Sequence, residues 1–277
     1  MIQERKTRQT KSWEELTFAD NFLFCKILEH DPDLCRRLLE LLLHIKIDHL
    51  EPPQAERVMQ ETLVAKSVRF DVYAKDDQRV FDIEMQTTDT KNLPKRARYY
   101  QSIIDMDNLS KGENYTKLRD SYVIFLCLED IFRKGQPVYF FENTCRGDRQ
   151  LKLDDRAYKV FFNAAACDTL KGDDERDFFR FLNGEKADSV FSKSIEEKVA
   201  FAKRNMEWRR QYMTWQQTID EAKEISFEEG ARQTARETAR KLLNEGDAPE
   251  KVARCCSLPL AEVLSLQAVL SRETVAR

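Results

Sequence analysis

The sequence predicts an α/β fold, in which a mixed central sheet is flanked by helices and followed by an α-helical C-terminal extension. Two runs within residues 68–86 alternate between apolar and polar side chains with a period of two, which is typical of strands. Residues 122–128 are almost continuously apolar, as in a strand buried on both faces. After Leu170 the pattern changes to charged stretches at helical spacing, which indicate the extension.

The first part of the chain is predicted to contain two helices. Asp20 precedes an apolar run over 22–28 and suits the N-cap of the first helix. The second helix has a clearer start, because Asp31 is a favoured N-cap and Pro32 a favoured first residue. A further strand is expected near 58–63.

The two alternating runs are predicted to form a hairpin through a tight polar turn at 75–78. A long helix over 94–110 follows, with Pro94 in its first turn. Two more strands are expected at 138–142 and 158–163, which completes the sheet.

The extension is predicted to begin with a helix around Phe178 and Phe179, followed by a long charged helix over 189–217 and helix-forming residues over 217–243. Two short helices at 247–256 and 260–270 then flank a turn. Their packing is expected to involve Val252, Cys255, Leu260 and Leu264. The second of these helices is almost devoid of basic residues, which favours protein packing or a folding cap over DNA readout.

The chain is thus expected to contain a flexible N-terminus (1–13), an α/β domain (14–170), a helical extension (171–245) and a small helix-turn-helix-like pair (246–277).

Composition excludes several classes of protein. The net charge is −3 over 277 residues, so any anion-binding surface must be a local patch. Seven cysteines form no CxxC pair, and four of them lie in apolar surroundings, which fits buried thiols in a reducing compartment. The start of the sequence lacks a signal peptide, and no apolar run is long enough to span a membrane, so a cytoplasmic protein is expected.

The hairpin carries the candidate chemistry. Alternation assigns one polar face of the hairpin to four residues, Asp71, Asp82, Glu84 and Gln86. In the first strand it places Tyr73 on the same face as Asp71, and Phe70 on the opposite face. Three neighbouring carboxylates repel one another unless a cation lies among them, so we interpret the hairpin as a metal site.

Asp71 and Glu84, on adjacent strands, can both reach one Mg²⁺ ion, which needs only one or two carboxylates. The backbone carbonyl of Met85 is expected to provide a further oxygen. Mn²⁺ is the alternative ion. A bound ion polarises a phosphodiester and lowers the pKa of its water.

An Asp followed about a dozen residues later by Glu-x-polar is the arrangement of PD-(D/E)xK nucleases, although the pattern alone is common. The surrounding sequence is more specific. The runs SVRFDVYAKD, VFDIEMQTTD, LPKRARYYQSIIDMDNLSKGENY and SYVIFLCLEDIF, in this order, resemble the bacterial Rpn family of recombination-promoting nucleases, also described as PD-(D/E)xK nuclease family transposases. LTFADNFLFCKILEHDPDLCRRLLELLL resembles the opening of that family, and VYFFENTC and YKVFFNAAA resemble its later strands, so the likeness covers about 13–215.

The resemblance implies a restriction-endonuclease-like core over 14–170, with Asp71 and Glu84 as catalytic metal ligands. Gln86 is the third catalytic residue and stands where the wider superfamily has Lys. A carboxamide can orient the attacking water but brings no positive charge to the transition state. The charge must come from Arg69, Lys95 or Arg96 or from a second metal ion, or else the reaction is slow.

DNA is expected to contact Arg69, Lys95, Arg96 and Arg98. The last three lie in the first turns of the predicted helix after the hairpin, where free N–H groups, the helix dipole and basic side chains together attract phosphate. Tyr100, one turn further on, either stacks on a base or closes the core.

Two acids are candidate accessory residues. Asp82 either touches the metal or forms a salt bridge with Arg69 or Arg79. Asp20 either caps its helix or stands beside the metal, as first-helix acids of the superfamily sometimes do.

The sequence therefore predicts a Mg²⁺-dependent DNA endonuclease acting in recombination or mobile-element processing, without a small-molecule cofactor or a membrane partner. The charged helices suit self-association, and a dimer is expected. One alternative is a catalytically inactive protein of the same fold that binds DNA or serves in assembly, which the missing Lys favours. Another is an RNase or a phage-defence nuclease, because hydrolysis of either polymer uses the same ligands.

Overall fold

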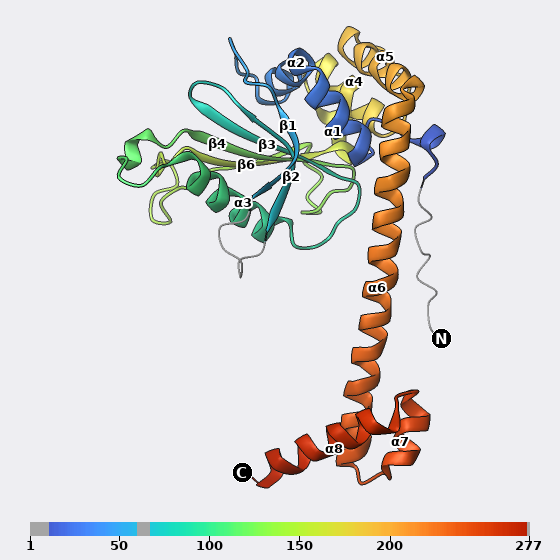
Figure 1. Ribbon diagram of the computed structural model, residues 1–277. Coiled ribbons are helices and arrows are strands. Elements are labelled where there is room, and N and C mark those ends of the chain that lie inside the picture. Colours follow the sequence, from blue (N-terminus) through green and yellow to red (C-terminus); the bar gives the residue numbers. More distant parts are fainter. Residues whose placement is uncertain (1–10, 60–66, 276–277) are drawn as a thin grey trace. The chain divides into compact units, whose positions relative to one another are not determined.

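A computed structural model describes residues 11–59 and 67–275. The chain forms two compact units, one up to Arg209 and one from Arg210, and each is described by itself. The first unit is built on a six-stranded sheet with the strand order β1-β2-β3-β4-β6-β5 (Figure 1).

The sheet is mixed, as predicted. β4 runs parallel to β3 and β6, and the remaining neighbours are antiparallel. The near-continuous apolar run lies in the central strand β4, where Ile124, Phe125 and Leu126 are fully buried. The strands are β1 (Gln54–Met59), β2 (Val68–Lys75), β3 (Arg79–Gln86), β4 (Asp120–Cys127), β5 (Val138–Phe141) and β6 (Ala157–Asn163).

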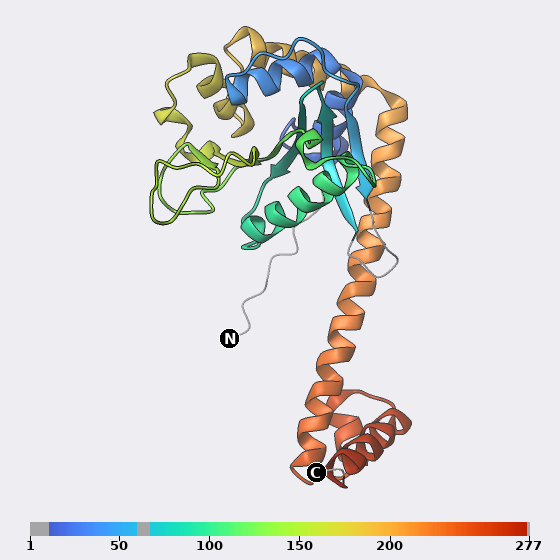
Figure 2. The ribbon, with the colours of Figure 1, turned by 90° about the vertical axis from the view of Figure 1, so that its left-hand side faces the viewer.

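Helices cover both faces of the sheet. Figures 1 and 2 show α3 on one face and α1, α2, α4 and α5 on the other. On the second face the rings of Phe162 in β6 and Phe179 in α4 stack with centroids 5.4 Å apart. The helices are α1 (Asn21–His30), α2 (Pro32–Leu43), α3 (Leu93–Asn108), α4 (Asp173–Leu182) and α5 (Val190–Arg204), with short 3-10 turns at Trp13–Glu15, Tyr115–Lys117 and Ala164–Thr169.

Local capping signals locate the helix starts well. Asp31 caps α2 as predicted, because its carboxylate accepts a hydrogen bond of 3.0 Å from the Leu34 N–H. Asp20 has the extended backbone of an N-cap before α1, but its side chain makes no capping hydrogen bond. Pro94 lies in the first turn of α3, also as predicted.

The hairpin departs from strict alternation. The β2–β3 ladder runs from Lys75 opposite Val80 to Val72 opposite Ile83 and ends there. The rings of Phe70 and Tyr73 lie 5.5 Å apart in the core that faces α3, so the prediction that Phe70 faces away from Tyr73 is wrong.

Glu56, across from Asp71 in the β1–β2 register, has a φ of 51° and interrupts that ladder. Both ladders keep one register through this region, so no residue is inserted as it is in a β-bulge. The slip in alternation between Phe70 and Tyr73 therefore coincides with a local distortion of the backbone opposite Asp71.

The charged region after α4 also differs from the prediction. The helix expected over 189–217 is broken at Asn205, which has an extended backbone and follows α5. The Asn205 side chain accepts hydrogen bonds of 3.0 and 3.1 Å from the N–H groups of Glu207 and Trp208 and so caps the next helix. That helix, α6 (Met206–Asn244), continues for 39 residues.

The second unit contains α6 from Arg210 onward, α7 (Pro249–Cys256) and α8 (Leu260–Val275), with the αL residue Ser257 between the last two. Its small core consists of Ala239, Val252, Leu258 and Val263. The predicted packing was right for Val252 and wrong for Cys255, Leu260 and Leu264, which are exposed. Val263 is buried where the neighbouring Leu264 was expected.

Some predictions fall partly outside the described residues. Of the strand expected near 58–63, residues 58 and 59 belong to β1 and 60–63 are not described; residues 1–10 are likewise not described. Trp13 is buried, and its indole N–H donates to the carbonyl of Lys203 at 3.0 Å. Among the described helices, none combines the length and the apolar character needed to cross a membrane.

Candidate active site

Asp71 and Glu84 lie where the β2–β3 ladder opens. The N–H of Asp71 donates to Glu84 Oε1 at 2.9 Å, and the N–H of Met85 donates to Asp71 Oδ2 at 3.0 Å. Each carboxylate thus bonds the backbone of the opposite strand in place of a ladder hydrogen bond. Asp71 is 8% exposed and Glu84 1%, so the two predicted ligands are brought together in a nearly dry setting.

Helix α1 supports Asp71 from the other side. The Asn21 side chain hydrogen-bonds the Asp71 carboxylate, and Cys25 Sγ, one turn later, donates to the Asp71 carbonyl at 3.2 Å. Sequence reasoning missed Asn21 and selected its neighbour Asp20. The Asp20 carboxylate instead binds Lys11 Nζ at 2.8 Å and the Thr17 N–H at 2.7 Å. The sequence signal that could have identified Asn21 is its spacing. It lies four residues before Cys25, a buried cysteine, and therefore on the same face of the helix.

Arg96, in the first turn of α3, is the cation that reaches Glu84. Its guanidinium pairs with Glu84 Oε2, donates to Gln86 Oε1 at 3.4 Å and lies 5.2 Å from the centre of the Tyr100 ring. Arg69 instead pairs with Glu56 at 3.5 Å.

Gln86 lies at the edge of the same group. Its amide nitrogen donates at 2.9 Å to the carbonyl of Met85, the predicted carbonyl ligand, and the N–H of Met85 in turn donates to Asp71. The structure thus gathers Asp71, Glu84, Met85 and Gln86 around the opening of the ladder.

Asp82 is fully buried behind Glu84. As a carboxylate it has no hydrogen-bond donor for either oxygen among the described residues, and when protonated it has Glu84 as its hydrogen-bond partner. The predicted salt bridge is wrong for both candidates, because Arg69 pairs with Glu56 and Arg79 pairs with Asp76 at 2.6 Å.

The three acids have raised pKa values. Burial, with the charge of Asp71 adding to it, raises the pKa of Glu84 to about 8 against the opposing effect of Arg96. Burial also raises the pKa of Asp71, against the Met85 N–H and Asn21. The pKa of Asp82 is raised by burial and by the charges of Glu84 and Asp71. The site therefore lacks positive charge for its number of carboxyls.

The donor set fits a hard divalent cation. No group of three or more His, Cys, Asp or Glu side chains in the described ranges is arranged to hold a metal ion. Two carboxylates and one carbonyl are present, however, and Mg²⁺ usually keeps several waters beside one or two carboxylates. The Asp82 carboxylate, to which no described residue donates a hydrogen bond, agrees with a site that has one positive charge too few.

Residues 20–145 match the family model of the PD-(D/E)XK nuclease family transposase. The match agrees with the family that the sequence of this stretch resembles. The match begins just before α1 and includes Asp71, Glu84, Gln86 and Arg96. No curated protein and no solved structure gives a match.

The basic surface of the nuclease domain lies beside these acids. Lys95 and Arg98 are exposed on α3, and Arg69 is exposed on β2. A cavity of about 320 Å³ is lined by Asn92, Lys95, Arg96, Tyr99, Tyr100, Ser67 and Val68. Tyr100 packs against the core, with its ring 5.1 Å from that of Phe70, so in this structure it closes the core.

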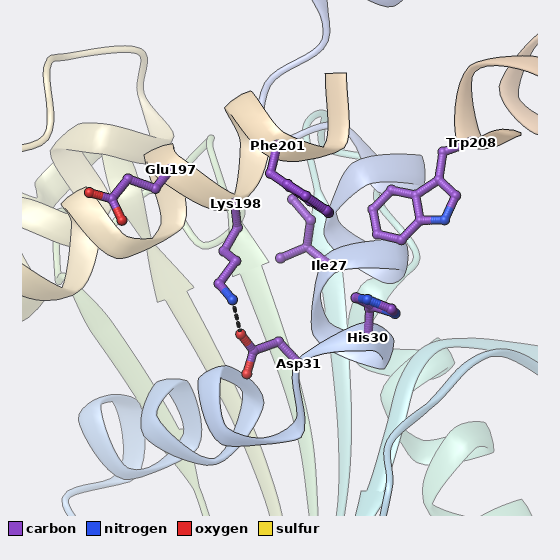
Figure 3. A pocket seen from close by; sticks show the side chains of 7 residues that line it. All are labelled: Ile27, His30, Asp31, Glu197, Lys198, Phe201 and Trp208. Carbon is purple, nitrogen blue, oxygen red and sulfur yellow. Dashed lines mark ion pairs between the residues drawn. The ribbon is translucent and has the colours of Figure 1, made fainter. Parts of the chain in front are cut away.

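A second cavity of about 360 Å³ lies on another side of the same unit, between α1, α5 and the start of α6 (Figure 3). Ile27, Phe201 and Trp208 give it an apolar lining, and Lys198 pairs with Asp31 at 2.7 Å across one end. One of its two acids is thus ion-paired, and none of the predicted ligands lines it. Asp71 and Glu84 therefore remain the candidate site.

Proposed function

We propose that the protein is a metal-dependent DNA endonuclease that hydrolyses phosphodiester bonds in recombination or mobile-element processing. The observation that supports this most strongly is the placement of Asp71 and Glu84, buried side by side where two strands of a PD-(D/E)XK nuclease domain separate. Buried acids with raised pKa values concentrate at functional sites.

Each residue has a defined part in this proposal. Asp71, Glu84 and the Met85 carbonyl would hold Mg²⁺ or Mn²⁺, which when bound would activate a water and neutralise charge on the phosphate. The Gln86 carboxamide orients the attacking water. Arg96, beside both Glu84 and Gln86, brings the positive charge that Gln86 lacks.

DNA is the proposed partner, held along its backbone by Arg69, Lys95 and Arg98 next to the acids. Their exposure on β2 and on the first turns of α3 agrees with contacts to phosphate. Binding through such contacts weakens with salt and does not depend on sequence.

The deciding experiment is nicking of supercoiled plasmid in Mg²⁺ and in Mn²⁺, with EDTA as the blank. We expect metal-dependent nicking that falls to background in Glu84→Gln. The matched control is Glu113→Gln, which removes an equivalent charge from an exposed residue whose ion-pair partner, Lys117, is not a residue of the site. Parallel reactions with single-stranded DNA and RNA identify the preferred polymer and test the RNase and phage-defence alternatives.

An inactive DNA-binding or assembly protein is the second candidate, and the observation that favours it is Gln86 at the position of the superfamily Lys. It predicts DNA binding that is indifferent to metal. Binding without cleavage in either ion would refute the nuclease proposal and leave this one.

We further propose that the protein works as a dimer in the cytoplasm. Ile225 and Phe227 are largely exposed on α6 and offer apolar area to a second copy. The seven free cysteines agree with a reducing compartment. Sedimentation equilibrium of the full chain tests the dimer, and a monomer at micromolar concentration would refute it.

A further inference from the structure

We propose that Arg96 is a positioning residue that occupies a metal-binding oxygen of Glu84 until a DNA phosphate draws it away. Metal and DNA would then bind cooperatively, because the phosphate removes the competitor of the metal. This inference rests on the proposed function, since it assumes that Glu84 is a metal ligand.

The first observation is that four of the donor oxygens of the site identified above already have partners. Asp71 Oδ2 accepts from the Met85 N–H, Glu84 Oε1 from the Asp71 N–H, and the Met85 carbonyl from Gln86. Only the partner of Glu84 Oε2, the Arg96 guanidinium, carries a charge. A guanidinium and a divalent cation compete for the same carboxylate oxygen, so Arg96 must give up this contact when a metal binds there.

The second observation is that Arg96 is held incompletely. Its Nε is buried and has no hydrogen-bond partner within the described part of the chain. The hydrogen bond to Gln86 is long, at 3.4 Å, for an N–H donor and an oxygen acceptor. A buried donor without a partner costs free energy, so a second position that satisfies it competes with the observed one.

The third observation is a place for the guanidinium to go. Arg96 also lines the cavity of about 320 Å³ that contains Asn92 and the exposed Lys95. This cavity lies at the first turn of α3, where Pro94 has no N–H and the N–H groups of Lys95 and Arg96 already donate to the Asn92 carbonyl, so side-chain charge is what would attract an anion there. A backbone phosphate, which carries one negative charge, would meet the cations of Lys95 and Arg96 in this cavity and give the Arg96 guanidinium two oxygen acceptors in place of Glu84.

The consequence is a coupling between the two ligands. When Arg96 turns towards the phosphate, Glu84 Oε2 becomes free for the metal and the positive charge moves to the group that reacts. Because coupling between two binding sites is reciprocal, DNA must raise metal affinity by the same factor as metal raises DNA affinity. In the absence of DNA, the site would bind metal weakly.

The first test is Mn²⁺ binding to the full chain without DNA, measured by electron paramagnetic resonance of the free ion. Arg96→Met keeps an apolar side chain against Tyr100 but removes the charge, and we expect it to bind Mn²⁺ roughly tenfold more tightly than the parent. The control is Lys95→Met, an equal change of charge one residue away, which should change the affinity far less. Arg96→Gln is a second variant in case Arg96→Met does not fold.

The second test repeats the titration with a duplex oligonucleotide, within a time over which gels show the duplex intact. DNA should raise the Mn²⁺ affinity of the parent more than that of Arg96→Met. The ratio of the two increases should equal the factor by which Arg96→Met binds Mn²⁺ more tightly than the parent in the absence of DNA. Equal enhancement in both, or no gain in Arg96→Met, would overturn the proposal. Glu84→Gln separates the two ideas: if it binds Mn²⁺ as well as the parent, the metal site itself is wrong, whatever Arg96 does.

Discussion

Replacing Asp82 by valine should stabilise the metal-free protein. Asp82 is fully buried in β3; none of the residues that the structure describes donates a hydrogen bond to its oxygens, and the side chain that it can hydrogen-bond is another acid, Glu84. Valine has a similar shape and favours strands. A buried polar group without partners costs about 1–3 kcal/mol, so Asp82→Val should raise the free energy of unfolding at pH 7 by about that amount.

The assay is urea unfolding in EDTA, followed by circular dichroism. Asp71→Asn is the contrasting variant, because the Asp71 carboxylate accepts from Met85 and Asn21 and its replacement should bring no comparable gain. A loss of more than about 1 kcal/mol in Asp82→Val would refute the reasoning and show that this carboxyl is bonded. Mn²⁺ titration of the same variant then decides its accessory role: unchanged affinity excludes Asp82 as a ligand.

Two further predictions concern single contacts. Asn21→Ala removes a hydrogen bond that lowers the pKa of Asp71. Loss of a side chain that hydrogen-bonds a metal ligand weakens metal binding, so the variant should bind Mn²⁺ roughly tenfold more weakly. An unchanged affinity in calorimetry would contradict this prediction. Burial raises the pKa of Glu175 above the ordinary glutamate value. Because the folded state then keeps this proton to a higher pH than the unfolded state does, the free energy of unfolding falls as the pH rises above the ordinary glutamate range. Glu175→Gln should therefore gain stability relative to the parent between pH 4 and pH 8 in urea titrations, and a constant difference would show that Glu175 is not responsible.

Much of the fold was readable from the sequence because its signals are local. The apolar run of β4 and the Asp31-Pro32 start of α2 need no knowledge of the rest of the chain. The break at Asn205 was missed because the flanking residues all favour helix and only the cap ends it. In the second unit, Leu264 and Val263 are both apolar neighbours, and only the packing of α8 against α6 and α7 selects Val263.

The site was predictable to the extent that its chemistry lies along β2 and β3. The spacing of Asp71 and Glu84 indicates two acids on paired strands, and the structure brings them together. The left-handed backbone of Glu56, which lies opposite Asp71 where alternation slips, leaves no mark in the sequence, since glutamate rarely adopts it. Asn21 and Arg96 come from helices on opposite faces of the sheet, and they contact Asp71 and Glu84, respectively. Both contacts depend on tertiary packing, which the local sequence does not reveal.

Gln86 and Arg96 are best understood as one arrangement. A lysine at position 86 would place a second cation beside the Arg96 guanidinium, with Glu84 as the shared partner. Glutamine instead offers an oxygen to Arg96 and an N–H to the Met85 carbonyl, so it accommodates a cation that arrives from α3. If Arg96 supplies the positive charge, as proposed above, the absence of lysine from β3 is not by itself a sign of lost activity. The decisive variant is Gln86→Lys: if the charge belongs to Arg96, added lysine should weaken Mn²⁺ binding and leave nicking no faster than in the parent.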